Sequence, residues 1–214
     1  MASAGLLYVG AILFINGLML LGWIPGKSAA ILNLFVGALQ VIVPVVLLTQ
    51  AEGEPAATFA AAGLFLFGFT YLYVGILQLA GISPEGLGWF SLFVAVVAVV
   101  IGVLSFGNIG DPLFGSIWLA WSVLWFMFFL LMGLGKESIA AMTGWFAIFC
   151  GWLTCAIPAL LLLSGAFVST GATAAVGGTV FAASFGVALY LGRPENPVGV
   201  RRDVRAAVSK EAMS

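Results

Sequence analysis

The chain has 214 residues, of which 63% are hydrophobic and only 7% are charged, with a formal net charge of −1 and no histidine. An average soluble domain carries about 25% charged residues, so a water-soluble core could not bury this much apolar surface and keep a hydrated exterior. Soluble enzymes, nucleic-acid binders and disordered chains are therefore excluded, and the composition predicts an integral membrane protein.

The charged residues divide the chain into long apolar segments, which predict helices that cross a membrane. A spanning helix needs about 20 apolar residues, and the alternating pattern of barrel strands is absent from the sequence. The predicted spans, in chain order, cover about 4–23, 28–49, 58–80, 88–106, 114–133, 140–163 and 167–191. The last two share one uncharged stretch, in which Ser-Gly-Ala at 164–166 predicts a turn. The expectation is an all-α membrane domain of seven helices over 1–192 and a polar tail over 193–214.

The basic residues predict the orientation of these helices. Lys27 follows the first span, Lys136 follows the fifth, and five basic residues follow the seventh, so all of them fall on one side. Because basic residues mark the cytoplasmic side, the N-terminus is predicted outside and the C-terminal tail in the cytoplasm. The acidic residues Glu52, Glu54 and Asp111 then lie outside. A six-span alternative would place five basic residues outside, so the charge rule supports the seventh helix.

Part of the sequence repeats. Gly-Leu-Leu-Tyr-Val-Gly at 5–10 returns as Gly-Leu-Phe-Leu-Phe-Gly at 63–68, and Gly17 matches Gly75 at the same spacing. A weaker third copy begins at Gly115. We interpret the pattern as three helical hairpins, formed by spans one and two, three and four, and five and six, with the seventh helix outside the repeat. Pseudo-symmetric repeats suit a central pathway through a bundle; chance similarity among apolar segments is the alternative.

The predicted spans hold neutral polar residues but no Asp, Glu, Lys, Arg or His. Intramembrane charges mark proton relays, ion sites and retinal sites, so a pump, a cation channel and a proton-coupled transporter are disfavoured. Cys150 and Cys155 lie five apart on one predicted helix and are poorly placed to bridge each other. No catalytic residue, metal or cofactor is expected. The neutral interior groups suit a small uncharged solute or, alternatively, helix association; they are Asn16, Asn33, Gln40, Thr70, Tyr71, Tyr73, Gln78, Ser91, Ser122 and Thr154.

An aromatic stripe runs along the fifth span. Trp118, Trp121 and Trp125 lie within about 60° of one helix face, because an α-helix turns about 100° per residue. Trp121 is in the middle of the span, away from the membrane interfaces where Trp is usually enriched. The stripe predicts a pore wall on which planar solutes slide while the indole N–H groups donate hydrogen bonds. A packed aromatic core or an oligomer interface is the alternative. Two smaller patches have helical spacing, namely Phe67 with Tyr71 and Leu6 with Leu13.

These segments resemble the AmiS/UreI family of bacterial urea channels and short-chain amide transporters. The resemblance rests on LLYVG at 6–10, Asn16-Gly17, Phe35-Val36-Gly37, FGFTYLY at 67–73, WLAWSVLW at 118–125 and Pro158, and it covers about 4–163. It implies an inner-membrane channel in which each protomer has its own six-helix pore, assembled as a homo-hexamer with a plug of membrane lipid. Matched motif by motif, the pore constrictions would involve Leu6, Leu13, Phe67, Tyr71, Trp118, Trp121, Leu124 and Trp125.

The chain departs from the acid-gated members of the family at two points. The resemblance implies a pore glutamate in their sixth helix, and alignment through Gly151, Thr154 and Pro158 puts Cys150 at that position. We count Cys150 among the candidate pore residues, and the missing carboxylate leaves the preference between urea and amides open. The chain also has no histidine and only a short first external loop, at about 50–57. We therefore expect a channel that is open at neutral pH and is not activated by acid.

The sequence thus predicts a passive channel for urea and short-chain, acetamide-like amides. An ion-coupled amide transporter is one alternative, although no ion site is visible in the sequence. A membrane scaffold or an accessory subunit of an amidase or urease system is another, and it would carry no flux of its own. An intramembrane enzyme lacks candidate catalytic groups.

Overall fold

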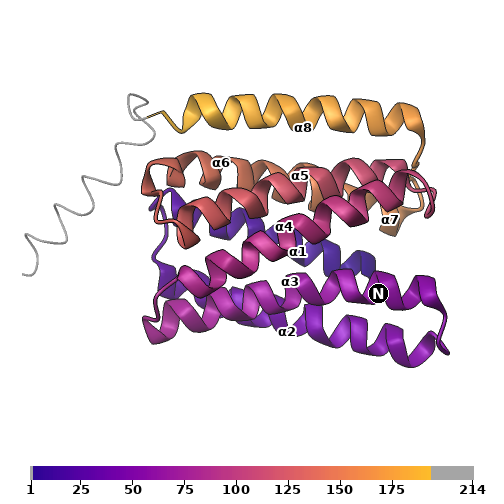
Figure 1. The fold of residues 1–214 in the computed structure, drawn as a ribbon, viewed down its shortest axis with the longest axis horizontal. Helices are drawn as coiled ribbons and strands as arrows, with labels where there is room; N and C mark the ends of the chain where they lie inside the picture. Colours follow the sequence, from indigo (N-terminus) through magenta and orange to yellow (C-terminus); the bar gives the residue numbers. More distant parts are fainter. Residues whose placement is uncertain (1, 194–214) are drawn as a thin grey trace, which may run out of the picture.

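The computed structural model describes residues 2–193 and shows a bundle of long helices with roughly parallel axes (Figure 1). The first five helices are α1 (Ala2–Leu20), α2 (Gly26–Gln50), α3 (Pro55–Ala80), α4 (Glu85–Phe106) and α5 (Pro112–Phe128), and α5 continues into the π-helical η1 (Phe129–Gly133). The sixth span is built from the 3₁₀ helix η2 (Glu137–Ile139), α6 (Ala140–Cys150), the π-helical η3 (Gly151–Ala156) and α7 (Ile157–Ser164). The last helix is α8 (Gly171–Leu191).

Seven helical segments of the described chain are long and apolar enough to cross a membrane. Their bounds differ from the predicted spans by only a few residues, which confirms the all-α, seven-helix prediction. Gly165 ends α7 with a φ of 74°, in the left-handed region that glycine adopts most easily, so the turn predicted at 164–166 is present. The predicted tail begins at the edge of the described chain, and its residues 194–214 lie outside it.

The tightest packing joins neighbouring hairpins of the predicted repeat instead of the two helices within one hairpin. The most extensive helix contacts are those of α2 with α3, α4 with α5, and α1 with the sixth span. The contacts of α1 with α2, of α3 with α4 and of α5 with α6 are less extensive. The bundle is therefore made of three close helix pairs, each formed across a boundary between two predicted hairpins.

Glycines explain how closely these helix pairs approach. A β-carbon added to Gly10 of α1 would lie 2.7 Å from the carbonyl oxygen of Gly151, and one added to Gly17 would lie 2.5 Å from that of Gly144. On α3, the matching glycine of the repeat, Gly68, faces the backbone of α2 in the same way. Small residues at membrane helix contacts let the two backbones approach and maximise van der Waals packing. The repeated glycines are thus packing positions.

The seventh helix lies on the outside of the bundle. Figure 1 shows α8 running along one edge, beside α5 and α6, which are the helices it contacts most. Its buried residues Ala174, Phe181 and Ala188 are seven apart and form one narrow face. The rest of α8 is largely exposed and apolar, as a lipid-facing or protein-facing membrane surface would be.

Candidate functional site

The centre of the bundle is an aromatic cluster formed by α3 and α5. The Phe67 ring lies 4.8 Å from both Trp121 and Trp125 and 5.8 Å from Trp118, measured between ring centroids. Tyr71 lies one turn further along α3, 6.3 Å from Phe67. The contacts with Trp121 and Trp125 are edge-to-face, an arrangement that aromatic rings favour. The tryptophan stripe of α5 and the Phe67–Tyr71 patch of α3, which the sequence predicted separately, are therefore one cluster.

A cavity of about 290 Å³ lies on one side of this cluster, at the N-terminal ends of α1, α3 and α5. We call it the N-terminal cavity. Its wall is mostly apolar, with Gln40 of α2 as a polar group. It is lined by Ala2, Ser3, Leu6, Val9, Gln40, Leu64, Phe67, Phe114, Trp118, Trp121 and Leu162.

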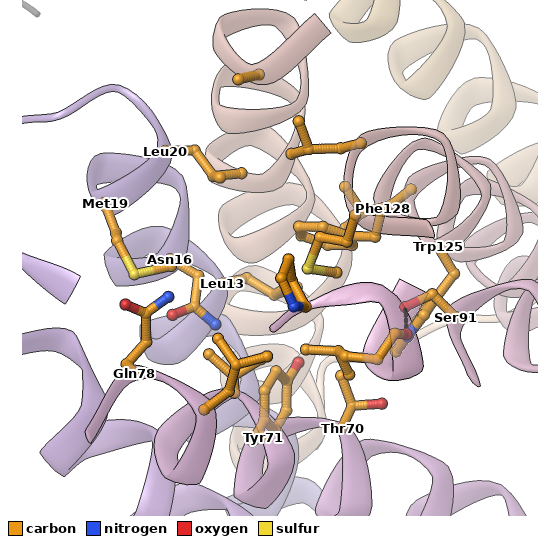
Figure 2. A pocket seen from close by; sticks show the side chains of 18 of the residues that line it. Leu13, Asn16, Met19, Leu20, Thr70, Tyr71, Gln78, Ser91, Trp125 and Phe128 are labelled. Carbon is orange, nitrogen blue, oxygen red and sulfur yellow. Dashed lines mark hydrogen bonds between the residues drawn. The ribbon is translucent and has the colours of Figure 1, made fainter. Parts of the chain in front are cut away.

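A second cavity, of about 270 Å³, lies on the other side, towards the C-terminal ends of the same three helices (Figure 2). We call it the C-terminal cavity. Its wall includes four of the predicted residues: Leu13, Tyr71, Leu124 and Trp125. Because α1, α3 and α5 run in the same direction, the two cavities follow one another along the bundle axis, and the aromatic cluster lies between them.

The structure brings eight of the nine predicted pore residues to these two cavities. Leu6, Phe67, Trp118 and Trp121 line the N-terminal cavity, while the other four line the C-terminal cavity. Cys150 is the exception. Within residues 2–193 it lines neither cavity; it is buried in the sixth span, and its thiol is free, as is that of Cys155.

Three buried polar atoms at the cavities have no hydrogen-bond partner within the described chain. They are the Tyr71 hydroxyl, the Trp125 Nε1 and the Gln40 Oε1. Figure 2 shows the Tyr71 hydroxyl directed into the C-terminal cavity. The amide group of Gln40 is fixed through its nitrogen, because its Nε2 donates to the Gly5 carbonyl at 2.8 Å. A buried polar group without a partner is costly, so these atoms are available to bind a polar solute that enters the bundle.

Trp121 differs from Trp125 because its indole N–H already has a partner. Its Nε1 donates to the Thr154 Oγ1 at 2.8 Å, and that hydroxyl donates to the Cys150 carbonyl at 2.5 Å. Thr154 lies in the π-helical η3, four residues before Pro158, whose ring nitrogen cannot donate to the preceding turn. The expectation that every tryptophan of the stripe offers a hydrogen-bond donor to a solute is therefore wrong for Trp121. Its indole ring lines the N-terminal cavity, and its N–H links α5 to the sixth span.

Asn16 of the C-terminal cavity has a structural role. It exchanges two hydrogen bonds with Asn33, at 3.0 and 2.7 Å, and Asn33 also donates to the Ala29 carbonyl. This buried amide pair joins α1 to α2, and it shows that some interior polar groups hold helices together, as the alternative interpretation of them supposed.

Sequence reasoning missed several of the lining residues, among them Phe114 and Glu137. Phe114 lines the N-terminal cavity and lies one helical turn before Trp118, so continuing the tryptophan spacing backwards would have found it. Glu137 contributes an exposed carboxylate to the wall of the C-terminal cavity. It begins the sixth span, and only the fold shows that this end faces the cavity. In the described part of the chain no cluster of acidic, cysteine or histidine residues could hold a metal ion.

Comparison with known proteins finds relatives of this chain among membrane transporters and channels. Residues 1–166 match the model of the AmiS/UreI family of transporters. The chain is 56% identical over 204 residues to AmiS2 of Rhodococcus erythropolis, a protein named as a transporter, covering 95% of this chain and 99% of that one. It is 49% identical over 193 residues to a Mycolicibacterium smegmatis protein named as a transporter of amidate substrates, covering 90% and 91%. The crystal structure of the urea channel of Helicobacter pylori superimposes with a TM-score of 0.69 at 36% identity, covering 78% of this chain and all of that one.

Proposed function

The chain belongs to the AmiS/UreI family of transporters, and from that premise we propose that it is a passive channel for small neutral amides and urea. It is a multi-pass membrane protein of a transporter family and not an enzyme. The observation that carries the proposal is that two cavities follow one another along the bundle axis, with the aromatic cluster between them. Beside this cluster, three buried polar atoms have no hydrogen-bond partner in the described chain.

The polar atoms match the chemistry of an amide. An amide or urea carbonyl accepts hydrogen bonds and its NH₂ group donates them. The Trp125 N–H can donate to the carbonyl oxygen, and the Tyr71 hydroxyl and the Gln40 Oε1 can accept from the nitrogen. A solute passing the cluster would thus exchange part of its hydration for these groups, while the faces of Phe67 and Trp121 favour a flat molecule.

The size and charge of the site support a small, neutral solute. Each cavity is slightly smaller than the lower end, about 300 Å³, of pockets for drug-sized ligands. The N-terminal cavity has no charged residue among its described lining, and the C-terminal cavity has Glu137 alone, which is exposed. An ion that enters such a pathway loses hydration and gains no counter-charge at the cluster. Ions are therefore excluded, and coupling to an ion gradient has no site at the cluster.

We extend the proposal to the arrangement in the membrane. Both cavities are formed by a single chain, which supports one pore per protomer, and the family resemblance leads us to a homo-hexameric ring in the bacterial inner membrane. The positive-inside rule places the N-terminal cavity outside and the C-terminal cavity towards the cytoplasm. The channel is not activated by acid, because the sequence has no histidine and α2 and α3 are joined by residues 51–54 only.

The decisive experiment is stopped-flow uptake of acetamide and urea into proteoliposomes that hold the full chain, at pH 7.5 and pH 5. We expect uptake above that of empty liposomes at both pH values, with a rate proportional to solute concentration. Trp121→Ala should change the acetamide-to-urea ratio, whereas Trp152→Ala should not, because Trp152 is half exposed on the outside of the bundle.

Each alternative gives a different result in this experiment. Uptake that saturates and depends on an ion gradient would indicate a coupled transporter. An absence of uptake at both pH values would indicate a scaffold or accessory subunit. A several-fold increase in uptake between pH 7.5 and pH 5 would show that the channel is activated by acid.

A further inference from the structure

The segment that leads into the seventh helix is fastened to the start of α5. The Ser169 hydroxyl donates to the Asp111 carboxylate, and the Leu113 backbone N–H donates to the Ser169 Oγ at 3.0 Å. The same Asp111 oxygen accepts from the Phe114 backbone N–H at 3.1 Å and so caps α5. One serine from the connection between α7 and α8 thereby completes the hydrogen bonding of the first turn of α5.

The residue held by this network is Phe114, which lies between the connection and the N-terminal cavity. Its ring packs against Phe167, with the centroids 5.5 Å apart, and it also lines the cavity. Phe114 is one helical turn closer to the N-terminal end of α5 than Trp118. It is therefore the aromatic side chain that a solute entering from this end meets before the tryptophans.

The seventh helix, α8, also contacts the N-terminal end of α5. The Ser116 hydroxyl donates to the Ala174 carbonyl of α8 at 3.2 Å, and a β-carbon on Gly177 would lie 2.9 Å from the Leu113 side chain. Within the described chain none of the residues that line the two cavities belongs to α8. The helix thus lies outside both cavities, and it packs against the start of α5, which lines the N-terminal cavity.

We infer that Phe114 is a specificity-determining residue at the outer mouth of the pathway, and that Ser169 and Phe167 are its positioning residues. The effect of Phe114 on solute selectivity rests on the proposed channel function. A fixed ring at the mouth reduces the width available to a solute, so it should restrict amides with longer acyl chains more than acetamide. The seventh helix would then set the upper size of the solute without lining the pore.

Transport selectivity tests this assignment. We expect Phe114→Ala, Phe167→Ala and Ser169→Ala each to raise the ratio of butyramide to acetamide uptake at least threefold in proteoliposomes. Ser169→Thr should keep the parental ratio because it retains the hydroxyl. Val168→Ala is the matched control, since Val168 lies in the same connection with its side chain exposed.

A second measurement does not depend on transport. Leu64 lines the N-terminal cavity. In a Leu64→Cys variant, the rate at which a methanethiosulfonate reagent modifies the new thiol therefore measures access to the cavity. The parent chain, treated in the same way, corrects for modification of the two buried native thiols. Phe114→Ala and Ser169→Ala should accelerate this modification several-fold. Faster modification without any acetamide uptake would support the positioning of Phe114 and refute the channel. The opposite result is also possible: Ser169→Ala and Phe167→Ala take up acetamide normally, with an unchanged modification rate and an unchanged butyramide-to-acetamide ratio. That result would overturn the inference and leave the channel function standing.

Discussion

Removing a single oxygen atom, in Tyr71→Phe, separates the proposed transport role of that residue from its structural role. The Tyr71 ring packs beside Phe67, and phenylalanine preserves that contact. The hydroxyl has no hydrogen-bond partner among residues 2–193, so the substitution breaks no protein hydrogen bond in that range. Folding stability should therefore stay at the parental level, while a solute that passes Tyr71 loses one interaction.

The size of the effect follows from the value of one hydrogen bond. A neutral hydrogen bond contributes about 0.5–1.5 kcal/mol net. If it is made where the solute passes the aromatic cluster, its loss slows permeation by roughly two- to twelvefold. Urea and acetamide should both be affected because each offers an N–H group to the hydroxyl.

The assay is stopped-flow uptake of both solutes, with the thermal midpoint measured on the same preparation. Tyr73→Phe is the matched control, because Tyr73 is two residues further along α3 and, in the described chain, lines neither cavity. Uptake by Tyr71→Phe equal to that of the parent and of Tyr73→Phe would refute the role of the hydroxyl. A large fall in the thermal midpoint would show that the group has a structural partner.

Two further substitutions test the supports of the pathway. Thr154→Val removes the acceptor of the Trp121 N–H and leaves that buried donor without its partner, so it should cost about 1–3 kcal/mol and lower the thermal midpoint by several degrees. Gly10→Ala places a β-carbon 2.7 Å from the Gly151 carbonyl oxygen, so it should destabilise the contact of α1 with the sixth span by about 1–3 kcal/mol, measured by thermal unfolding in detergent.

Matched controls distinguish these effects from general sensitivity. Thr143→Val removes a hydroxyl that donates to the Ile139 carbonyl within its own span, so it should destabilise less than Thr154→Val. Gly178→Ala meets open space on α8 and should stabilise that helix slightly, because alanine has the higher helix propensity. If a variant and its control lost the same amount of folding stability, the result would contradict the packing or the hydrogen bond on which that prediction depends.

The membrane makes the helices of this protein easy to predict and their contacts difficult. Each span must be apolar over a fixed length, so charges and turns alone located all seven. Spacing along single helices also found Phe67, Tyr71 and the tryptophans. It could not show that the Trp121 N–H is bound by Thr154, because the two residues lie 33 positions apart on different spans.

The sixth span shows why a position in an alignment does not fix the direction of a side chain. The π-helical η3 begins directly after Cys150 and ends before Pro158. A π-helical turn contains an extra residue, so Cys150, which precedes it, and Pro158, which follows it, are not related by α-helical spacing. Alignment placed Cys150 at a pore position, yet in the described chain its side chain reaches neither cavity.

The pairing of the helices determines where the pathway can change its width. The cavities are lined mainly by α1, α3 and α5, and each of these helices belongs to a different close pair: with the sixth span, with α2 and with α4, respectively. Glycine contacts within a pair are too close to slide without steric overlap, as the environment of Gly10 shows. The contacts between pairs are less extensive. A small movement of one pair relative to another would therefore widen or narrow the aromatic cluster and leave the tightest contacts intact. By fastening the first turn of α5, Ser169 restricts this movement at the end of the pathway where Phe114 lies.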